Sequence, residues 1–364
     1  SERTKAGKGL YRPELAVLLA YGKLELKREI VASRATQDPW FEGRLEAYFP
    51  KGLRKYKDAI HSHRLRPDII ATVIANDMIN RCGPSFPSRT MTSAGCDVVA
   101  LTAGYEAAKQ ALGFEALWDQ VEALDLKIPS AGQMTLFRRL VSGLRGATFW
   151  LARRSGREGL TVAELTARYA PGFKALHSLL PEILPKAERA QVDAHVTRLI
   201  EAGAPVKMAE AAAVLGPLAN AVDLVDLAEA SSWSLPNVAR LYYATGAAFA
   251  FDRVRAAAGE FRAGDIFERT ALRRLIEDLL SEQTQLTRSI IAGGAQAGDD
   301  AASAKSAVAA WAALRPDLAR AATRTVEEIE TGGGGWTFAK LTIANAALRE
   351  LAAEAASGRK RRAS

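Results

Sequence analysis

Histidine and cysteine side chains that could bind a metal lie in the first third of the sequence. His61 and His63 are two residues apart, and Cys82 and Cys96 follow them. Zinc sites usually place such ligands at short, regular spacings, and these four residues match none of the common patterns. We therefore expect no metal site here, and expect His61 or His63 to lie at a helix end instead.

Other patterns that could support catalysis lack the structure around them that the chemistry requires. Gly332–Gly335 could form a phosphate loop, but no strand precedes it and no Lys-Ser/Thr pair follows it. There is no Gly-x-Ser-x-Gly motif, and neither cysteine has neighbours that would obviously lower its pKa. The carboxylate pairs Glu327/Glu330 and Asp299/Asp300 lie on polar stretches typical of a solvated surface. The sequence thus predicts no catalytic residue, cofactor site or metal site in this chain.

Residues 66–82 form the helix with the most informative polar side chains. Apolar residues cover most of its circumference, which predicts burial among other helices. Asn76 and Asn80 fall on the same stripe as Ile69 and Val73. A buried amide needs a partner, so these side chains either bind neighbouring helices or face a cleft or a partner.

Several helix starts can be located from proline and capping signals. Arg12-Pro13-Glu14 begins a helix that runs to about Ser33, and Asp38-Pro39 begins a shorter one. Ser130-x-x-Gln133 and Thr161-x-x-Glu164 read as capping boxes, and Asp265 precedes a long helix. In the helix after Ser130, apolar residues at the spacing of one helical face predict a packed neighbour: Leu140, Leu144, Ala147 and Leu151.

The predicted helices suggest two helical subdomains. A polar break with two glycines at 153–159 separates residues 1–154 from residues 160–364. Glycine-rich linkers are expected near 293–302 and 332–335, and residues 83–95 read as the longest loop of the first half. We count about fourteen helices.

Composition supports the same fold class. The 364 residues are 48% hydrophobic and 25% charged, which excludes a disordered or fibrous chain. The sequence is rich in Ala, Leu, Arg and Glu and has almost no alternating β-branched runs, so we predict an all-α fold without a Rossmann sheet. No stretch reaches the roughly 18 apolar residues of a membrane span, and the polar opening Ser1–Gly9 does not resemble a signal peptide. We expect a cytoplasmic protein with reduced thiols.

The net charge of +8 is unevenly distributed. Lys plus Arg minus Asp plus Glu gives 17 − 11 = +6 for residues 1–100, 13 − 10 = +3 for 101–200, 9 − 14 = −5 for 201–300 and 10 − 6 = +4 for 301–364. The last figure comes from the tail, Arg359-Lys360-Arg361-Arg362. We see no array of basic residues interleaved with aromatic ones, and therefore expect no nucleic-acid partner.

Specific stretches of the sequence resemble the large bacterial NAD-specific glutamate dehydrogenases. The run from Gly9 to Tyr21, GLYRPELAVLLAY, is similar to the family's GLTRPELAVLLAY. The similarity continues through His63-Arg64-Leu65-Arg66, Ile69-Ile70-Ala71-Thr72, Ala75-Asn76, Asn80-Arg81 and Gly83. The chain departs from the family at Pro67-Asp68 and in the stretch 265–274.

The resemblance implies a position within a larger enzyme. It covers the C-terminal helical domain, so the glutamate-binding lysines, the catalytic Asp and the nucleotide loop are expected upstream of Ser1. The parent would oxidise L-glutamate with NAD and water to 2-oxoglutarate, ammonium and NADH, while this chain alone would be inactive. Its partners would be the catalytic domain of the same polypeptide and other subunits of a homo-oligomer. The residues expected to form polar contacts with that domain are Arg12, Glu14, Arg64, Asn76, Asn80 and Arg81.

Two alternatives remain open at this point. The chain could be a free-standing helical interaction module whose Asn76/Asn80 pair and basic first third bind a protein or an anionic partner. An effector site that tunes the parent's activity could also lie among the helices, although no residue points to one.

Overall fold

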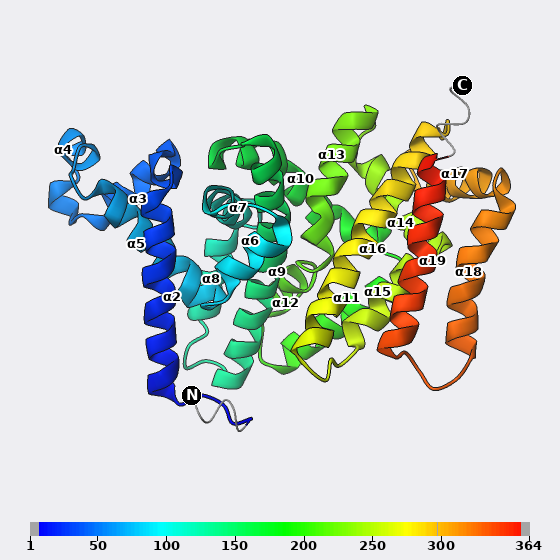
Figure 1. Cartoon of the computed structure of the whole chain (residues 1–364), viewed down its shortest axis with the longest axis horizontal. Helices are drawn as coiled ribbons and strands as arrows, with labels where there is room; N and C mark the ends of the chain where they lie inside the picture. The colour runs from blue at the N-terminus through cyan, green and yellow to red at the C-terminus, as the bar shows by residue number, and fades with distance from the viewer. Residues whose placement is uncertain (1–6, 297, 358–364) are drawn as a thin grey trace. The chain divides into compact units, whose positions relative to one another are not determined.

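The computed structural model describes residues 7–296 and 298–357, and in this part of the chain the fold is entirely helical (Figure 1). There are 18 α-helices and four short 3-10 turns, and no strand occurs among these residues. This confirms the all-α prediction without a Rossmann sheet, although the predicted fourteen helices were too few. None of the helices described is long and apolar enough to cross a membrane. The basic tail 359–362 and residue 297 of a predicted linker lie outside the described residues.

The chain forms two compact units, Ser1–Phe173 and Lys174–Ser364. The predicted boundary at 154–160 stays a prediction, but the stretch 153–158 is not a break, because it is the last part of a 29-residue helix. The helices of unit 1 are α2 (Arg12–Ala32), α3 (Glu42–Tyr48), α4 (Lys57–His61), α5 (Arg66–Cys82), α6 (Phe86–Ala94), α7 (Val98–Ala111), α8 (Phe114–Glu122) and α9 (Ser130–Glu158). Helix α10 (Val162–Ile183) begins in unit 1 and ends in unit 2.

The core of unit 1 is the packing of α7 against α9. The predicted apolar stripe of α9, from Leu140 to Leu151, is buried as expected. Gly104 on α7 permits the close approach, because a Cβ at this position would lie 2.4 Å from the backbone nitrogen of Ala152. Any larger residue at Gly104 would force these two helices apart.

The local signals in unit 1 were partly right. Thr161 and Glu164 form the predicted capping box, with the Thr161 N–H 2.8 Å from Glu164 Oε2 and the Glu164 N–H 3.3 Å from Thr161 Oγ1. The box predicted at Ser130 was wrong: the Gln133 amide donates instead to the Val121 carbonyl, which ties α9 to α8. The predicted loop at 83–95 was also wrong, because it contains α6.

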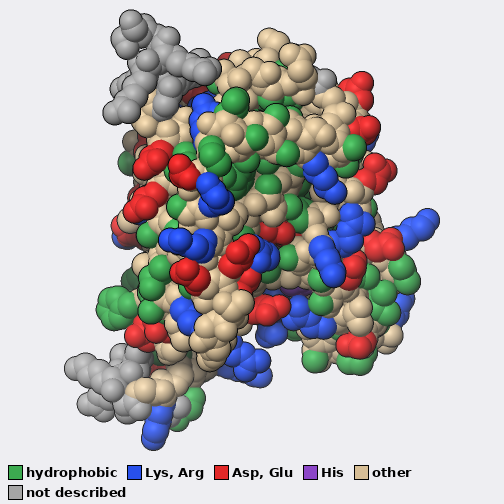
Figure 2. Space-filling view, turned by 90° about the vertical axis from the view of Figure 1, so that its right-hand side faces the viewer, with side chains coloured by type: hydrophobic (Ala, Val, Ile, Leu, Met, Phe, Trp, Pro, Cys, Tyr) green, Lys and Arg blue, Asp and Glu red, His purple; other side chains and the backbone are tan. Residues whose placement is uncertain are grey.

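Unit 2 has a second core built from its C-terminal helices. Its helices are α11 (Lys186–Glu201), α12 (Val206–Ala213), α13 (Ala221–Ser231), α14 (Leu235–Ala248), α15 (Phe251–Glu260), α16 (Ile266–Ala292), α17 (Ala301–Ala313), α18 (Pro316–Thr331) and α19 (Phe338–Ser357). Asp265 caps α16 as predicted, accepting from the Glu268 N–H at 2.8 Å. Leu279, Leu286, Ile290, Leu341 and Leu348 are fully buried between α16 and α19. On the face seen in Figure 2, acidic and basic side chains are interspersed rather than separated by sign.

The two glycine-rich connections have defined partners. Between α18 and α19, the Lys340 ammonium donates to the carbonyls of Gly333 at 2.5 Å and Gly335 at 2.9 Å. Between α16 and α17, Asp299 accepts from the Asn237 amide at 3.0 Å, and Asp300 caps α17. Asp299 and Asp300 are both exposed, as expected, and each also accepts one of these hydrogen bonds.

Candidate docking surface

The N-terminal half of α2 presents large apolar side chains to solvent. Farther along the helix, Leu26 and Ile30 are 3% and 0% exposed, and α2 packs on α5. The side chains toward the N-terminus are 43–69% exposed: Leu10, Tyr11, Leu15, Val17, Leu18, Tyr21 and Leu24. We refer to these seven residues as the α2 apolar surface. In Figure 1, α3, α4 and α5 lie beside the upper part of α2, and its lower, N-terminal part extends below them.

The sequence of α2 explains this surface. Between Tyr11 and Leu24 the only charged residues are Arg12, Glu14 and Lys23, and the apolar residues are not confined to one helical face. A helix that is apolar on several sides is normally buried among other elements. Contiguous apolar patches on soluble proteins usually mark sites of association.

Polar groups border the start of the α2 apolar surface. The Tyr11 N–H donates to Glu14 Oε2 at 2.8 Å, so Glu14 caps the helix and lies close to its N-terminus. Arg12 is exposed at the first position of the helix. Two of the six predicted contact residues therefore lie beside the exposed apolar side chains.

The two asparagines of α5 lie where the helix is open rather than buried. The fully buried positions of α5 are Ile70, Ile74, Met78 and their neighbours on the other side of the helix. Asn76 is half-buried and Asn80 is exposed, as Ile69 and Val73 on the same stripe are only half-buried. The expectation of a buried amide pair was therefore wrong. The two amides are accessible to a partner, and whether they bind one stays a prediction.

Arg81, a third predicted contact residue, belongs to a charge network inside unit 1. Its guanidinium forms a bidentate pair with Glu115 at 3.0 and 2.8 Å and lies 3.1 Å from Asp77 Oδ1. It also stacks over the rings of Phe114 and Trp118, 5.3 and 4.9 Å from their centroids. Arg81 is thus fully engaged within the chain.

The centre of this network is Lys109, whose side chain is 1% exposed. Its ammonium lies 2.7 Å from Asp77 Oδ2 and 2.5 Å from Glu115 Oε1, and Asp77 also accepts from the Tyr105 hydroxyl at 3.1 Å. Arg44 of α3 completes the network with a 2.6 Å bond to the fully buried Glu106. Three cations and three carboxylates from α3, α5, α7 and α8 therefore lie together.

The electrostatics of the network show how its charges balance. Burial would raise the pKa of Glu115, but hydrogen bonds from Arg81 and Lys109 outweigh this and lower it to about 2. Burial raises the pKa of Glu106, and the attraction of Lys109 and Arg44 offsets this only in part. Glu106 Oε1 has no hydrogen-bond partner and lies 3.9 Å from the Lys109 ammonium.

This arrangement holds helices together and offers no reactive group to a substrate. Each carboxylate faces a cation, as in structural ion-pair networks. The sequence analysis missed Asp77, Glu106 and Lys109. The available signal was charge at i, i+4 in α5 and at i, i+3 in α7, two helices otherwise rich in buried residues.

Unit 2 contains a second buried polar cluster of structural character. The Arg255 guanidinium binds Glu188 of α11 and the Gln283 side chain of α16. The Gln283 amide in turn donates to the Tyr242 carbonyl of α14 at 2.7 Å. These bonds join four helices around one buried cation.

Unit 1 contains a cavity with a volume of about 800 Å³. Its carboxylates are Asp38 and Asp97, and both serve as helix caps: Asp38 accepts the N–H groups of Trp40 and Val162, and Asp97 accepts that of Ala100. Burial raises the pKa of Cys96, which also lines this cavity, to about 11, so its thiol is protonated at neutral pH. The cavity therefore presents no acid–base pair or activated nucleophile.

The four residues considered as metal ligands have other environments. His61 Nε2 lies 2.9 Å from Glu46 Oε1, and His63 Nδ1 accepts from the Leu65 N–H at 3.1 Å, just before α5. Cys82 is buried, and burial raises its pKa to about 12. In the described part of the chain, no group of three or more potential ligands lies together.

Arg64, the last predicted contact residue, is exposed in the turn between α4 and α5. The structure therefore groups Arg12 with Glu14 and Asn76 with Asn80, and engages Arg81 inside unit 1. A contact of these residues with another domain stays a prediction.

Known proteins are similar to this chain over almost its whole length. The profile of a family described as "Glutamate dehydrogenase, C-terminal" matches residues 7–350. The NAD-specific glutamate dehydrogenase of Halomonas elongata is 29% identical over 352 residues, and that of Pseudomonas aeruginosa is 28% identical over 353. The Mycobacterium tuberculosis protein of the same name is 26% identical over 352 residues.

These alignments cover 96–97% of this chain but 21% of each relative. The chain thus spans about a fifth of the length of the proteins it matches. The match confirms the resemblance inferred from the first helix and from residues 63–83. On this basis, the chain belongs to the family of glutamate dehydrogenase C-terminal regions.

Proposed function

We propose that this chain is the non-catalytic C-terminal helical domain of an NAD-dependent glutamate dehydrogenase, and that the α2 apolar surface packs on the rest of that enzyme. The parent would convert L-glutamate, NAD and water into 2-oxoglutarate, ammonium and NADH in the cytoplasm, as part of glutamate catabolism. In this proposal NAD binds outside this chain, and the assembled enzyme is a homo-oligomer.

The observation that carries the proposal is the exposure of the α2 apolar surface. Fully burying a Leu or Tyr side chain contributes roughly 1.5–3 kcal/mol, and these seven side chains are about half exposed. Covering all of them would contribute on the order of 5–10 kcal/mol before the entropy of association is subtracted. An interface of this strength suits a permanent contact within one protein.

The polar groups of unit 1 favour a structural, non-catalytic role for the chain. The buried charges are paired with each other, and the carboxylates of the 800 Å³ cavity cap helices. Arg12 and Glu14 flank the α2 apolar surface, and we assign them as its polar rim.

The test compares Leu18→Asp/Tyr21→Asp in the full-length enzyme and in this chain alone. In the isolated chain both side chains are largely exposed, so the thermal unfolding midpoint should change little. In the full-length enzyme the same change should release the C-terminal region to limited proteolysis and lower glutamate-dependent NADH formation.

A matched control places the same two acidic residues on another exposed apolar pair. Ile266 and Phe267 at the start of α16 are 59% and 80% exposed, and Ile266→Asp/Phe267→Asp should leave the full-length enzyme intact. The proposal fails if the α2 variant behaves like this control, or if the isolated chain reduces NAD in the presence of glutamate.

A further inference from the structure

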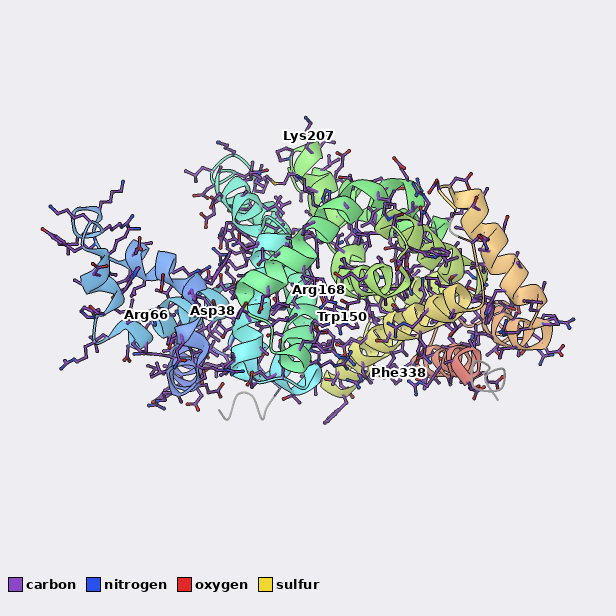
Figure 3. All side chains as sticks on the ribbon, turned by 90° about the horizontal axis from the view of Figure 1, so that it is seen from above. Asp38, Arg66, Trp150, Arg168, Lys207 and Phe338 are labelled. Atoms are coloured by element: carbon purple, nitrogen blue, oxygen red, sulfur yellow. The ribbon has the colours of Figure 1, made fainter. Side chains whose placement is uncertain are left out.

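Residues 48–66 form a compact, strongly basic projection at one end of unit 1, which we call the basic arm. It contains Lys51, Arg54, Lys55, Lys57, Arg64 and Arg66 against one acidic residue, Asp58, so its net charge is 6 − 1 = +5. The arm includes α4, which lies at the outer end of unit 1 (Figure 1), and long side chains project from this end beyond the labelled Arg66 (Figure 3).

Hydrogen bonds and ion pairs of some of its charged side chains hold the basic arm in a fixed conformation. The Arg54 guanidinium donates to the carbonyls of Phe49 at 2.9 Å and Ala47 at 2.8 Å, at the end of α3. Glu46 pairs with both Lys57 at 3.1 Å and His61 at 2.9 Å, and Ile60 is buried beneath them. These contacts fix the conformation of the arm before any partner binds, which lowers the entropy cost of binding.

The remaining cations point to solvent. Lys51 and Arg64 are exposed, and neither side chain forms an ion pair or hydrogen bond with the described residues. Lys55 is exposed as well, and its ammonium lies 5.0 Å from the centroid of the Tyr56 ring. The outward surface of the arm therefore carries three positive charges that nothing described in the chain neutralises.

Large apolar side chains lie among these charges. The exposed fractions are 59% for Tyr48, 48% for Leu53, 55% for Tyr56 and 46% for Leu65. Four large apolar side chains exposed close together are unusual on a surface that contacts only water. Tyrosine and arginine with aliphatic neighbours are the composition of protein interfaces rather than of solvated faces.

We propose that the basic arm is a docking site for an acidic protein segment that carries apolar side chains of its own. The three outward cations would attract its carboxylates, and Leu53, Tyr56 and Leu65 would receive its apolar residues. This surface is separate in sequence from the α2 apolar surface, so the inference does not depend on the proposed contact with the parent enzyme.

The geometry favours a protein over a nucleic acid. Single-stranded nucleic acids need free ring faces for stacking, and Lys55 covers the Tyr56 ring while Tyr48 packs edge-on against Phe49 at 5.9 Å. Arg54 and Arg66, which could have gripped phosphates, donate to backbone carbonyls. The aliphatic side chains that remain suit a peptide.

The test selects binders from a displayed library of random peptides on the immobilised full chain. We expect the selected peptides to be enriched in Asp and Glu together with apolar residues. Their affinity should fall at least about ten-fold for the charge variant Lys51→Glu/Lys55→Glu/Arg64→Glu. It should fall less for the apolar variant Leu53→Ser/Leu65→Ser, and binding to this variant should keep its dependence on salt concentration.

A matched control separates this site from general attraction to a basic protein. Lys207→Glu/Arg262→Glu/Lys305→Glu changes the net charge equally at three exposed positions of unit 2 and should leave the affinity within about twofold. Circular dichroism melts of all variants verify that each is folded.

Three results would overturn the proposal. The selected peptides could lack acidic residues. The triple variant of the arm could bind them with the same affinity as the unmutated chain. A single-stranded oligonucleotide could bind the arm more tightly than any selected peptide. Each outcome is independent of whether the α2 apolar surface contacts the parent enzyme.

Discussion

Replacing Lys109 with Met tests whether the charge network of unit 1 is structural. The Lys109 side chain is 1% exposed and its ammonium contacts Asp77 at 2.7 Å and Glu115 at 2.5 Å. Methionine keeps most of the side-chain volume but removes the charge. Three carboxylates would then face two guanidiniums in a largely buried site. Removing one partner of a buried pair costs about 3–5 kcal/mol, and we expect a loss of stability of that order.

The pH dependence of this loss follows from the charges left behind. Without Lys109, the pKa values of Glu106 and Glu115 should rise, because the attraction of the Lys109 ammonium lowers both. A carboxylate whose pKa is raised in the folded state lowers the free energy of unfolding least at a pH low enough to protonate it. The stability deficit of Lys109→Met should therefore be largest near neutral pH and shrink as the pH falls toward about 4. Adding Glu106→Gln, which removes the network carboxylate whose Oε1 has no hydrogen-bond partner, should recover part of the loss at pH 7.

The assay is urea unfolding, with hydrogen exchange of α5 and α7 peptides to isolate unit 1 from unit 2. The matched control is Lys27→Met, because the Lys27–Asp68 pair is 2.9 Å long but 32% and 45% exposed. Such a pair contributes only about 0–1 kcal/mol. The reasoning would be refuted if Lys109→Met cost no more than Lys27→Met, or if its deficit did not change with pH.

Three further outcomes follow from the packing. Burial raises the pKa of Glu282 to about 7, so the ionised carboxylate is unfavourable in the folded chain. The free energy of unfolding should therefore fall as the pH rises from about 4.5 to 7. Glu282→Gln should flatten this pH dependence and stabilise the chain on the order of 2 kcal/mol at pH 8, measured by urea unfolding. Gly104→Ala should destabilise unit 1 by at least about 1–3 kcal/mol, whereas Gly43→Ala, with open space around its Cβ, should be neutral or stabilising in the same melts. Lys340→Met should increase hydrogen exchange in the turn between α18 and α19, where its ammonium binds backbone carbonyls, without affecting unit 1.

Much of the secondary structure could be predicted because its signals are local. Asp265 caps α16, and Thr161 and Glu164 cap α10, through contacts between residues three positions apart. The apolar spacing of Leu140 and Leu151 gave the buried face of α9 for the same reason. Such features depend only on the few residues around them.

The errors occurred where the outcome depends on distant contacts. Gln133 fits a capping box in sequence but binds the Val121 carbonyl of another helix. Asn80 lies on an apolar stripe, yet the neighbours of α5 cover the other side of the helix, so the amide stays exposed. The charge network pairs residues far apart in the sequence, such as Arg44 and Glu106, which are 62 positions apart, and helical periodicity carries no information on that pairing.

The family assignment does not explain why unit 1 has two unlike surfaces. Residues 1–173 carry 26 − 18 = +8 and residues 174–364 carry 23 − 23 = 0, so unit 1 holds the whole net charge of the chain. The basic arm supplies five of these eight charges, and the α2 apolar surface supplies almost none. A single partner would have to be apolar on one side and acidic on the other. Two separate contacts account for the pattern more simply, and variants in one surface should then leave the binding properties of the other unchanged.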